Sequence, residues 1–435
     1  MCIRDSFYID IAGHAEDAKV VKALEELKAI AAFYRNLGSY PHSAWALEDK
    51  LVNTSAHKSA SLRMTSKIGL KHIHAIAPYV GGRPISEVAR EYGLDENKIV
   101  KLASNENPLG MPKSALDAML KAASDLGRYP DSNGFELKKV LSGHLGVPSD
   151  WITLGNGSND ILELAARAVA QAGDEVFFSR HAFAVYPLAT QAVGAKAIEV
   201  APTDSYGHDL PAMLAAVKAA GDKAKLVFVA NPNNPTGSYL TAKEIEDFLI
   251  ALPSHVVVVL DEAYNEYLSP EQRYDAIAWV KRFPNMILSR SFSKAYGLAG
   301  LRIGYGVAQP HLTDLLNRIR QPFNVNSLAQ AAAIAAFGDK AFLQKGFELN
   351  HAGYEQLTQA FDQLHLTYLP SAGNFVLVKV GDDDQAGERI NLELLKRGII
   401  VRPVGNYGLP KWLRISIGLP EENAAFIEAL KAILA

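Results

Sequence analysis

The sequence predicts an α/β protein with a mainly parallel sheet covered by helices on both faces, followed by a smaller α+β domain. Short apolar segments alternate with amphipathic segments from about residue 97 onward, as expected where strands alternate with helices. Segment 256–260 is apolar at every position, which is typical of a strand buried on both faces. After about residue 340 the order becomes helix, strand, helix, strand, helix, and this order predicts the second domain.

The predicted elements follow one another along the chain. The expected strands of the first domain are 151–156, 174–180, 225–232, 255–264 and 286–291, with a further strand-like run at 301–307. The expected helices between them are 160–170, 185–194 and 241–252. The C-terminal elements are helix 347–364, strand 373–380, helix 390–398, strand 413–418 and helix 422–434. We therefore expect an N-terminal arm over 64–96, a large domain over 97–335 and a small domain over 336–435.

Composition bounds the kinds of partner. The 435 residues are 49% hydrophobic and 21% charged, an ordinary globular composition that is long enough for two packed units. A net charge of −3 argues against nucleic acid or an anionic membrane as partner. We expect neither a membrane span nor a signal peptide. Cys2 is the only cysteine, so no internal disulfide can form and a cytoplasmic location is expected.

The first 63 residues depart from this pattern. Residues 7–45 read as strand, helix, strand, and 46–63 are polar without clear periodicity. Segment 7–45 resembles the C-terminal end of the regulatory (ACT) domain of prephenate dehydratases, whose first half is missing. Half a sheet leaves unpaired edges and half a core, so we do not expect it to bind an effector. We expect 1–63 to be a non-native extension and Met64 to be the native start.

Polar residues gather where the expected strands end, which is where ligands bind in such sheets. The turn 155–160 (GNGSND) opens a helix and could hold a phosphate on backbone N–H groups, although a tight turn explains it equally well. Segment 231–237 (NPNNPTG) fits a proline-rich turn, but that interpretation leaves Asn234 unexplained. Asp261 ends the most apolar strand, where a carboxylate needs a cationic partner unless it caps a helix or joins a structural ion pair.

Lys294 lies in segment 291–300 (SFSKAYGLAG), between two strand-like runs. Ser291, Ser293 and Arg302 surround it in sequence, and two hydroxyls with a guanidinium group make a good phosphate site. A lysine amine can form a Schiff base where its surroundings favour the neutral form. With a carboxylate for a pyridine nitrogen and hydrogen-bond donors for a ring hydroxyl, these features together indicate pyridoxal 5'-phosphate (PLP).

A series of motifs supports this interpretation by resemblance. In order, they are LASNENPLG (102–110), RYPD (128–131), NPNNPTG (231–237), DEAY (261–264) and SFSKAYGLAGLRIGY (291–305). Their order and spacing resemble fold-type I PLP-dependent aminotransferases and, more narrowly, the histidinol-phosphate aminotransferase family, from about residue 70 to 435. The resemblance implies a mainly parallel seven-stranded sheet in the large domain.

The resemblance also implies a role for each motif residue. Lys294 would form the Schiff base and move the substrate proton, and Asp261 would pair with the pyridine nitrogen. The other implied contacts are with the ring oxygen (Asn234, Tyr264), the phosphate (Ser291, Ser293, Arg302, Gly157, Ser158, Asn159) and the ring face (Phe183). Many members of the family have tyrosine at the last position, so Phe183 keeps the stacking and lacks the phenolic hydrogen bond. No metal is implied.

A homodimer is implied as well. In the family, the tyrosine of the RYP motif, here Tyr129, reaches the cofactor phosphate of the neighbouring subunit. The tyrosine of IAPYVGG, here Tyr79, lies near the partner's substrate pocket. A buried aromatic residue is the plainer explanation of each.

The substrate prediction depends on two arginines that face the pocket in the family, Arg414 and Arg402. Two guanidinium groups suit the dianionic phosphate of histidinol phosphate, which favours transamination between histidinol phosphate and 2-oxoglutarate, in histidine biosynthesis. Arg402 could instead be a solvated loop charge. The dehydratase-like N-terminus favours the alternative, an aromatic amino acid (phenylalanine, tyrosine or prephenate) aminotransferase.

Two other classes of function are each suggested by one segment of the sequence. Residues 291–294 match the S-x-x-K motif of penicillin-recognising enzymes, but the S-D-N and K-T-G motifs are missing from the sequence. A non-catalytic effector-binding module would rest on segment 7–45 alone. Neither class explains the ordered set of motifs.

Overall fold

The structure is a computed structural model of the chain that describes residue 22 and residues 69–79 and 81–435. Contacts divide the chain into Met1–Ile68 and Gly69–Ala435, and only the second unit is described below. The predictions for residues 1–63, and for Met64 as the native start, lie outside the described residues apart from Lys22.

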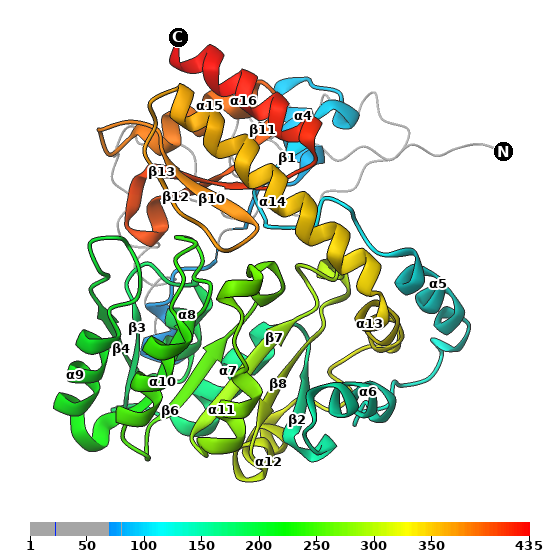
Figure 1. Ribbon diagram of the computed structural model, residues 1–435, viewed down its shortest axis with the longest axis vertical. Helices are drawn as coiled ribbons and strands as arrows, with labels where there is room; N and C mark the ends of the chain where they lie inside the picture. The colour runs from blue at the N-terminus through cyan, green and yellow to red at the C-terminus, as the bar shows by residue number, and fades with distance from the viewer. Residues whose placement is uncertain (1–21, 23–68, 80) are drawn as a thin grey trace. The chain divides into compact units, whose positions relative to one another are not determined.

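A seven-stranded sheet forms the centre of the first part of this unit (Figure 1). Its strands pair in the order β2-β8-β7-β6-β5-β3-β4, and all neighbours are parallel except β8, which is antiparallel to both β2 and β7. The strands are β2 (Ile152–Gly155), β3 (Glu175–Ser179), β4 (Lys196–Val200), β5 (Ala224–Ala230), β6 (Val257–Asp261), β7 (Met286–Ser291) and β8 (Gly304–Ala308).

Helices cover both faces of this sheet, and each face has its own apolar cluster (Figure 1). Burial on both faces explains why β6 is apolar up to its last residue. One face carries α5 (Lys113–Ala122), α6 (Phe135–Leu145), α9 (Leu210–Ala220), α10 (Ala242–Ala251), α11 (Ala276–Arg282) and α13 (Ser327–Gly338). The other face carries α7 (Ser158–Val169), α8 (Val185–Ala192) and α12 (Pro310–Ile319).

Local sequence fixes where several of these helices begin. Thr241 and Glu244 form a capping box at α10, and Asp209 and Asp275 accept hydrogen bonds from the first turns of α9 and α11. Such caps satisfy backbone N–H groups that have no partner inside the helix. These local signals therefore set the residue at which each helix begins.

The C-terminal part is a four-stranded antiparallel sheet in the order β12-β13-β10-β9, packed with three helices around a separate apolar cluster. Its elements are α14 (Lys340–Gln363), β9 (Tyr368–Leu369), β10 (Phe375–Lys379), α15 (Ala386–Lys396), β12 (Arg402–Val404), β13 (Leu409–Ser416) and α16 (Pro420–Leu434). Figure 1 shows the long helix α14 running from the large sheet towards this smaller one.

A segment near the start of the unit packs with this C-terminal part. Strand β1 (Val100–Lys101) pairs in parallel with β11 (Ile399–Ile400). Helix α4 (Ile85–Tyr92) contributes Val88 and Ala89 to a cluster that also contains Leu395. The chain therefore touches the smaller sheet before it enters the larger one.

The predicted fold class is confirmed. The structure has the mainly parallel seven-stranded sheet and the smaller α+β part, and two details differ. Strand β4 was not predicted, because 196–200 is short and its polar residues, Lys196 and Glu199, do not alternate with apolar ones. The run 301–307 becomes a strand only at Gly304, because Arg302 has a left-handed backbone with φ 56° that cannot continue a strand. Among the described residues, no helix is long and apolar enough to cross a bilayer.

Candidate active site

A cavity of about 280 Å³ opens at the carboxyl ends of the parallel strands, where the smaller part of the unit meets the larger. Such an edge is the expected ligand position in an open α/β sheet. The predicted residues that line it are Tyr79, Ser158, Asn159, Phe183, Asn234, Asp261, Tyr264, Ser291, Ser293, Lys294, Arg302, Arg402 and Arg414. The fold therefore collects in one cavity residues that are spread over more than 300 positions of sequence.

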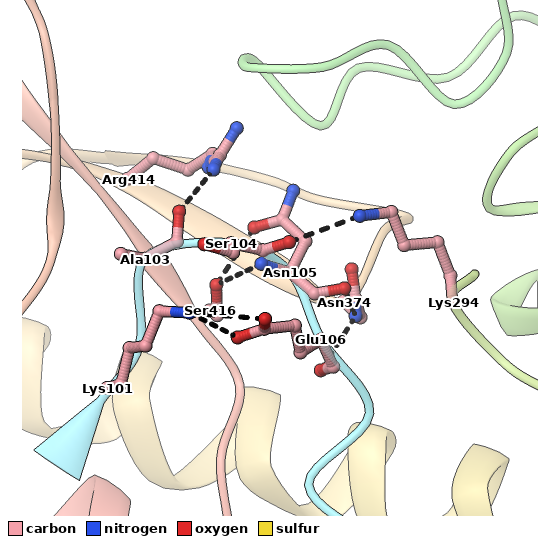
Figure 2. Close-up of polar contacts among 9 residues, drawn as sticks. All are labelled: Lys101, Ala103, Ser104, Asn105, Glu106, Lys294, Asn374, Arg414 and Ser416. Atoms are coloured by element: carbon pink, nitrogen blue, oxygen red, sulfur yellow. Dashed lines mark hydrogen bonds and ion pairs between the residues drawn. The ribbon is translucent and has the colours of Figure 1, made fainter. Parts of the chain in front are cut away.

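Lys294 follows β7 and points its amine into the cavity. Its Nζ donates to the carbonyl oxygen of Ser104 at 3.1 Å (Figure 2). The pKa of Lys294 is lowered to about 8, mainly by burial and also by the nearby Arg414 and Arg302, against the opposing effect of Glu106. The neutral amine, which is the form that acts as nucleophile or base, is therefore far more populated near neutral pH than in an exposed lysine.

Asp261 ends β6 and is buried at the floor of the cavity. Its Oδ2 accepts from the Tyr186 hydroxyl at 2.9 Å, whereas Oδ1 is buried without a hydrogen-bond partner. The pKa of Asp261 is raised to about 6, mainly by burial and also by Glu262, against the opposing effect of the Tyr186 hydrogen bond. A buried acceptor without a partner calls for an explanation, and a ligand that donates to Oδ1 supplies one.

Asn234 and Tyr264 present donors to the cavity. Arg414 Nη1 donates to Asn234 Oδ1 at 2.6 Å, so the amide nitrogen of Asn234 is the group left to donate elsewhere. The Tyr264 hydroxyl accepts from Asn105 Nδ2 at 3.1 Å. Burial raises the pKa of Tyr264 to about 12, so the phenol keeps its proton. Two donors side by side can bind an electron-rich oxygen.

The turn before α7 and the loop after β7 form a cradle for an anion. The Arg302 guanidinium packs against Gly157, where an added Cβ would collide with Nη2, and the φ of +85° also favours glycine. Arg302 Nη1 donates to Ser293 Oγ at 3.3 Å, and Ser291 Oγ accepts from the backbone N–H of Ser293 at 3.0 Å. The first turn of α7 adds unpaired backbone donors beside these groups.

The mouth of the cavity is aromatic and cationic. Phe183 packs edge-on against Tyr186, with ring centroids 6.0 Å apart. The Arg402 guanidinium lies 5.7 Å from the centre of the exposed Tyr79 ring. Arg414 is buried in β13, donates from Nη2 to the Ala103 carbonyl oxygen at 2.6 Å, and leaves its buried Nε without a partner. This side of the cavity suits a negatively charged substrate group.

Tyr129 is the predicted residue that the fold places elsewhere. It is 82% exposed and stacks on Phe323 with centroids 4.6 Å apart. The explanation of Tyr129 as a buried aromatic residue is therefore wrong within this chain, and Tyr79, which is 54% exposed, is not buried either. Both rings are therefore accessible to another molecule, although Tyr79 also lines the cavity.

Three further residues at the cavity were not predicted as site residues. Tyr186 binds Asp261, Asn105 binds Tyr264, and Tyr407 lines the cavity beside Arg402. Asn105 lies in the motif 102–110 and Tyr186 in the predicted helix 185–194. Their roles depend on partners 159 and 75 positions away in sequence. No local pattern in the sequence could show those pairings. No group of three or more potential metal-binding side chains occurs among the described residues.

Comparison with known proteins places this geometry in a family. Residues 97–430 match the model for aminotransferase class I and II. Histidinol-phosphate aminotransferase 2 of Ralstonia nicotianae is 66% identical over 372 residues, which are 86% of this chain and 98% of the relative. Histidinol-phosphate aminotransferase 1 of Cupriavidus pinatubonensis is 65% identical over 366 residues, with 84% and 96% covered.

A solved structure is similar as well. The histidinol-phosphate aminotransferase of Sinorhizobium meliloti, in complex with pyridoxal-5'-phosphate, has a TM-score of 0.77 and 32% sequence identity, and the match covers 84% of this chain and 97% of that one. The family model, the curated relatives and the solved structure agree with the resemblance drawn from the motifs. The chain belongs to the class I and II aminotransferase family and, within it, to the histidinol-phosphate aminotransferases.

Proposed function

We propose that the protein catalyses transamination between histidinol phosphate and 2-oxoglutarate in histidine biosynthesis, with PLP as cofactor. The observation that carries this proposal is the meeting in one cavity of Lys294, Asp261 and the cradle at Arg302. PLP needs an amine, a carboxylate and an anion site together. The curated relatives named for this activity support the choice of substrate.

The cavity residues fit PLP. The free Oδ1 of Asp261 would accept from the pyridine nitrogen, the Asn234 amide and Tyr264 hydroxyl would donate to the ring oxygen, and the ring would lie against Phe183. The phosphate would occupy the cradle made by Ser158, Asn159, Ser291, Ser293, Arg302 and the glycine turn at Gly157. When bound, PLP supplies an aldehyde for amines and an electron-withdrawing ring that stabilises negative charge at the substrate Cα.

The residues of the chain supply binding and proton movement. Lys294 would hold the cofactor through its aldehyde, and the amine of Lys294, when free, would remove the Cα proton of the substrate. The lowered pKa of Lys294 suits this role near neutral pH. Asp261, with Tyr186 on its other oxygen, would favour the protonated pyridine nitrogen.

Arg414 and Arg402 bind the anionic end of the substrate. Arg414 is held by Asn234 and the Ala103 carbonyl, and its partner-free Nε points to a site for an anion. Arg402 lines the same cavity. Two guanidinium groups suit a phosphate dianion, and a carboxylate needs one.

We propose further that the active protein is a homodimer in the cytoplasm. The exposed Tyr129 would complete the phosphate site of the partner, and Tyr79 would lie near the partner's substrate pocket. Exposed aromatic side chains are typical of residues that become buried at an interface. A large domain over 97–335 and a small domain over 336–435, preceded by an arm over 64–96, complete this picture.

The test compares amino donors with purified protein and 2-oxoglutarate. We expect kcat/KM for histidinol phosphate to exceed that for phenylalanine or tyrosine. Arg402→Ala should lower kcat/KM for histidinol phosphate roughly 100-fold, since lost hydrogen bonds to a charged group contribute about 1.5–3 kcal/mol each, and the loss for phenylalanine should be much smaller.

Arg397→Ala is the matched control, because Arg397 is an exposed guanidinium paired with Glu393 outside the cavity. It should leave both donors unaffected. Equal losses for both donors in Arg402→Ala, or a wild-type preference for phenylalanine or prephenate, would assign the protein to aromatic amino acid transamination instead.

A further inference from the structure

Asn105 has an unusual backbone and an unusual number of partners for a residue in a connecting segment. It is 1% exposed, lines the cavity and has a left-handed backbone with φ 52°. Figure 2 shows it in segment 103–106, between Lys294 of the larger part and Ser416 of the smaller part. Asparagine adopts this conformation more readily than most residues other than glycine, and four hydrogen bonds hold Asn105 there.

These bonds use both the main chain and the side chain. The Asn105 N–H donates to Ser416 Oγ at 2.8 Å, and its carbonyl oxygen accepts from Asn374 Nδ2 at 2.9 Å. In the side chain, Oδ1 accepts from the Ser416 hydroxyl at 2.9 Å and Nδ2 donates to the Tyr264 hydroxyl at 3.1 Å. Two of the partners, Ser416 and Asn374, belong to the C-terminal sheet and the turn before it.

The hydrogen bonds of this network have mutually consistent directions. Ser416 Oγ accepts from the Asn105 main-chain N–H and donates its own proton to Asn105 Oδ1. With Oδ1 as the acceptor end of the amide, the Nδ2 donor end faces the Tyr264 hydroxyl. The Tyr264 oxygen therefore accepts a hydrogen bond from Asn105, and its own proton is available to another acceptor.

We propose that Asn105 is a positioning residue that turns the Tyr264 hydroxyl so that it donates into the cavity. The inference rests on the proposed PLP chemistry, in which the ring oxygen of the cofactor receives that proton. Tyr264 and Asn105 both line the cavity, so the free side of the hydroxyl faces the ligand. Asn105 therefore acts on the cofactor through Tyr264, and Ser416 acts on Asn105.

This relay has a measurable consequence. A donor to the ring oxygen favours its deprotonated form, and loss of that donor favours the protonated form. The pH at which the visible absorption of the bound cofactor changes should therefore rise when the Tyr264 proton is turned away. A residue that merely maintained the fold would change stability without moving this pH.

The principal variant is Asn105→Asp, which keeps the shape and replaces the donor with an acceptor. The Tyr264 proton should then bond to the new carboxylate, and the spectroscopic transition of the holoenzyme should move up by about one pH unit, a tenfold change in the proton equilibrium. The new charge alone could also raise the transition. Asn105→Asp is therefore repeated in a Tyr264→Phe background, where an effect transmitted by the hydroxyl must largely disappear.

Two other variants complete the test. Ser416→Ala releases the amide and should move the transition in the same direction by a smaller amount, and it replaces Asn105→Asp if that variant does not fold. Asn374→Ala removes a buried partner of the same segment without touching the side-chain relay, so it should lower stability and leave the transition unchanged.

The outcomes are separable. A wild-type protein that takes up no PLP would overturn the proposed function itself. Normal PLP uptake with an unshifted transition in Asn105→Asp and Ser416→Ala would overturn the role of Asn105. An equal shift in the presence and absence of the Tyr264 hydroxyl would overturn it too.

Discussion

The last residue of β6 and the residue after it, Asp261 and Glu262, are both buried carboxylates with different surroundings. Glu262 points away from the cavity and accepts from Arg290, with Nε at 2.9 Å and Nη2 at 2.8 Å. Asp261 lines the cavity; one of its oxygens accepts a hydrogen bond from the Tyr186 hydroxyl, and the other has no hydrogen-bond partner. The cluster around Glu262 satisfies its own charges, whereas the cavity is left with donors and acceptors that a ligand must satisfy. Burial alone therefore does not distinguish these two carboxylates: the one that lines the cavity is the one that keeps an oxygen without a partner.

The largest effect is expected on turnover, when Lys294 is removed from the cavity. Lys294→Ala should lose the covalent link to PLP and lower turnover by about 10⁴-fold, because nucleophile and general base are removed together. Borohydride reduction followed by mass spectrometry should label Lys294 in the wild type and leave the variant unlabelled. Full transamination by the variant would refute the assignment.

Breaking the buried ion pair between Arg290 and Glu262 should lower the free energy of unfolding instead. Arg290→Met leaves the Glu262 carboxylate buried without its ionic partner, which costs about 3–5 kcal/mol. Denaturant unfolding should show this loss, and the double variant with Glu262→Gln should recover much of it. A loss that persists in full in the double variant would mean that the pair is not the source of stability.

Removing the carboxylate of Asp261 should instead stabilise the cofactor-free protein against unfolding. The pKa of Asp261 is raised to about 6 by burial, above its unfolded value of about 3.9. The folded state therefore binds the proton more tightly, and its stability falls as the pH rises from about 4 to 6. The Asp261→Asn apoprotein should therefore be more stable than the wild-type apoprotein by up to about 3 kcal/mol at pH 7. The same variant should bind PLP less tightly.

The measurement is the unfolding free energy of the apoprotein at pH 4 and pH 7. Wild type and Asp261→Asn should be similar at the lower pH and should diverge at the higher one. A constant difference at both values of pH would exclude titration of Asp261 as the cause.

The smallest expected effect concerns the surface. Tyr129→Phe should weaken PLP binding about tenfold, since one hydrogen bond to a charged group is worth about 1.5 kcal/mol or more, while the stack on Phe323 stays. Mixing Tyr129→Phe with Lys294→Ala subunits should restore part of the activity if the tyrosine serves the partner. A fully active monomer in sedimentation would contradict the dimer.

The fold class could be predicted from local patterns, and thirteen of the residues that line the cavity could be predicted from the motifs and their resemblance to a known family. Alternating apolar segments indicated the sheet, and the motif around Lys294 indicated the site. The left-handed backbone of Arg302 was missed, because the contact of its side chain with Gly157 arises only after folding. Asn105 and Tyr186 were missed for the same reason, since the hydrogen bonds that give them a role join distant segments.

The contacts around Asn105 also show in which order the parts of the cavity become available during synthesis. Hydrogen bonds from Asn105 to Ser416 and from Arg414 to Ala103 each join residues 311 positions apart. A ribosome that has made the whole seven-stranded sheet has not yet made β13, so the emerging chain carries Lys294 without the wall that completes its cavity. The anion-binding wall formed by Arg402 and Arg414 is therefore complete only in the finished polypeptide, because both residues lie in its C-terminal strands.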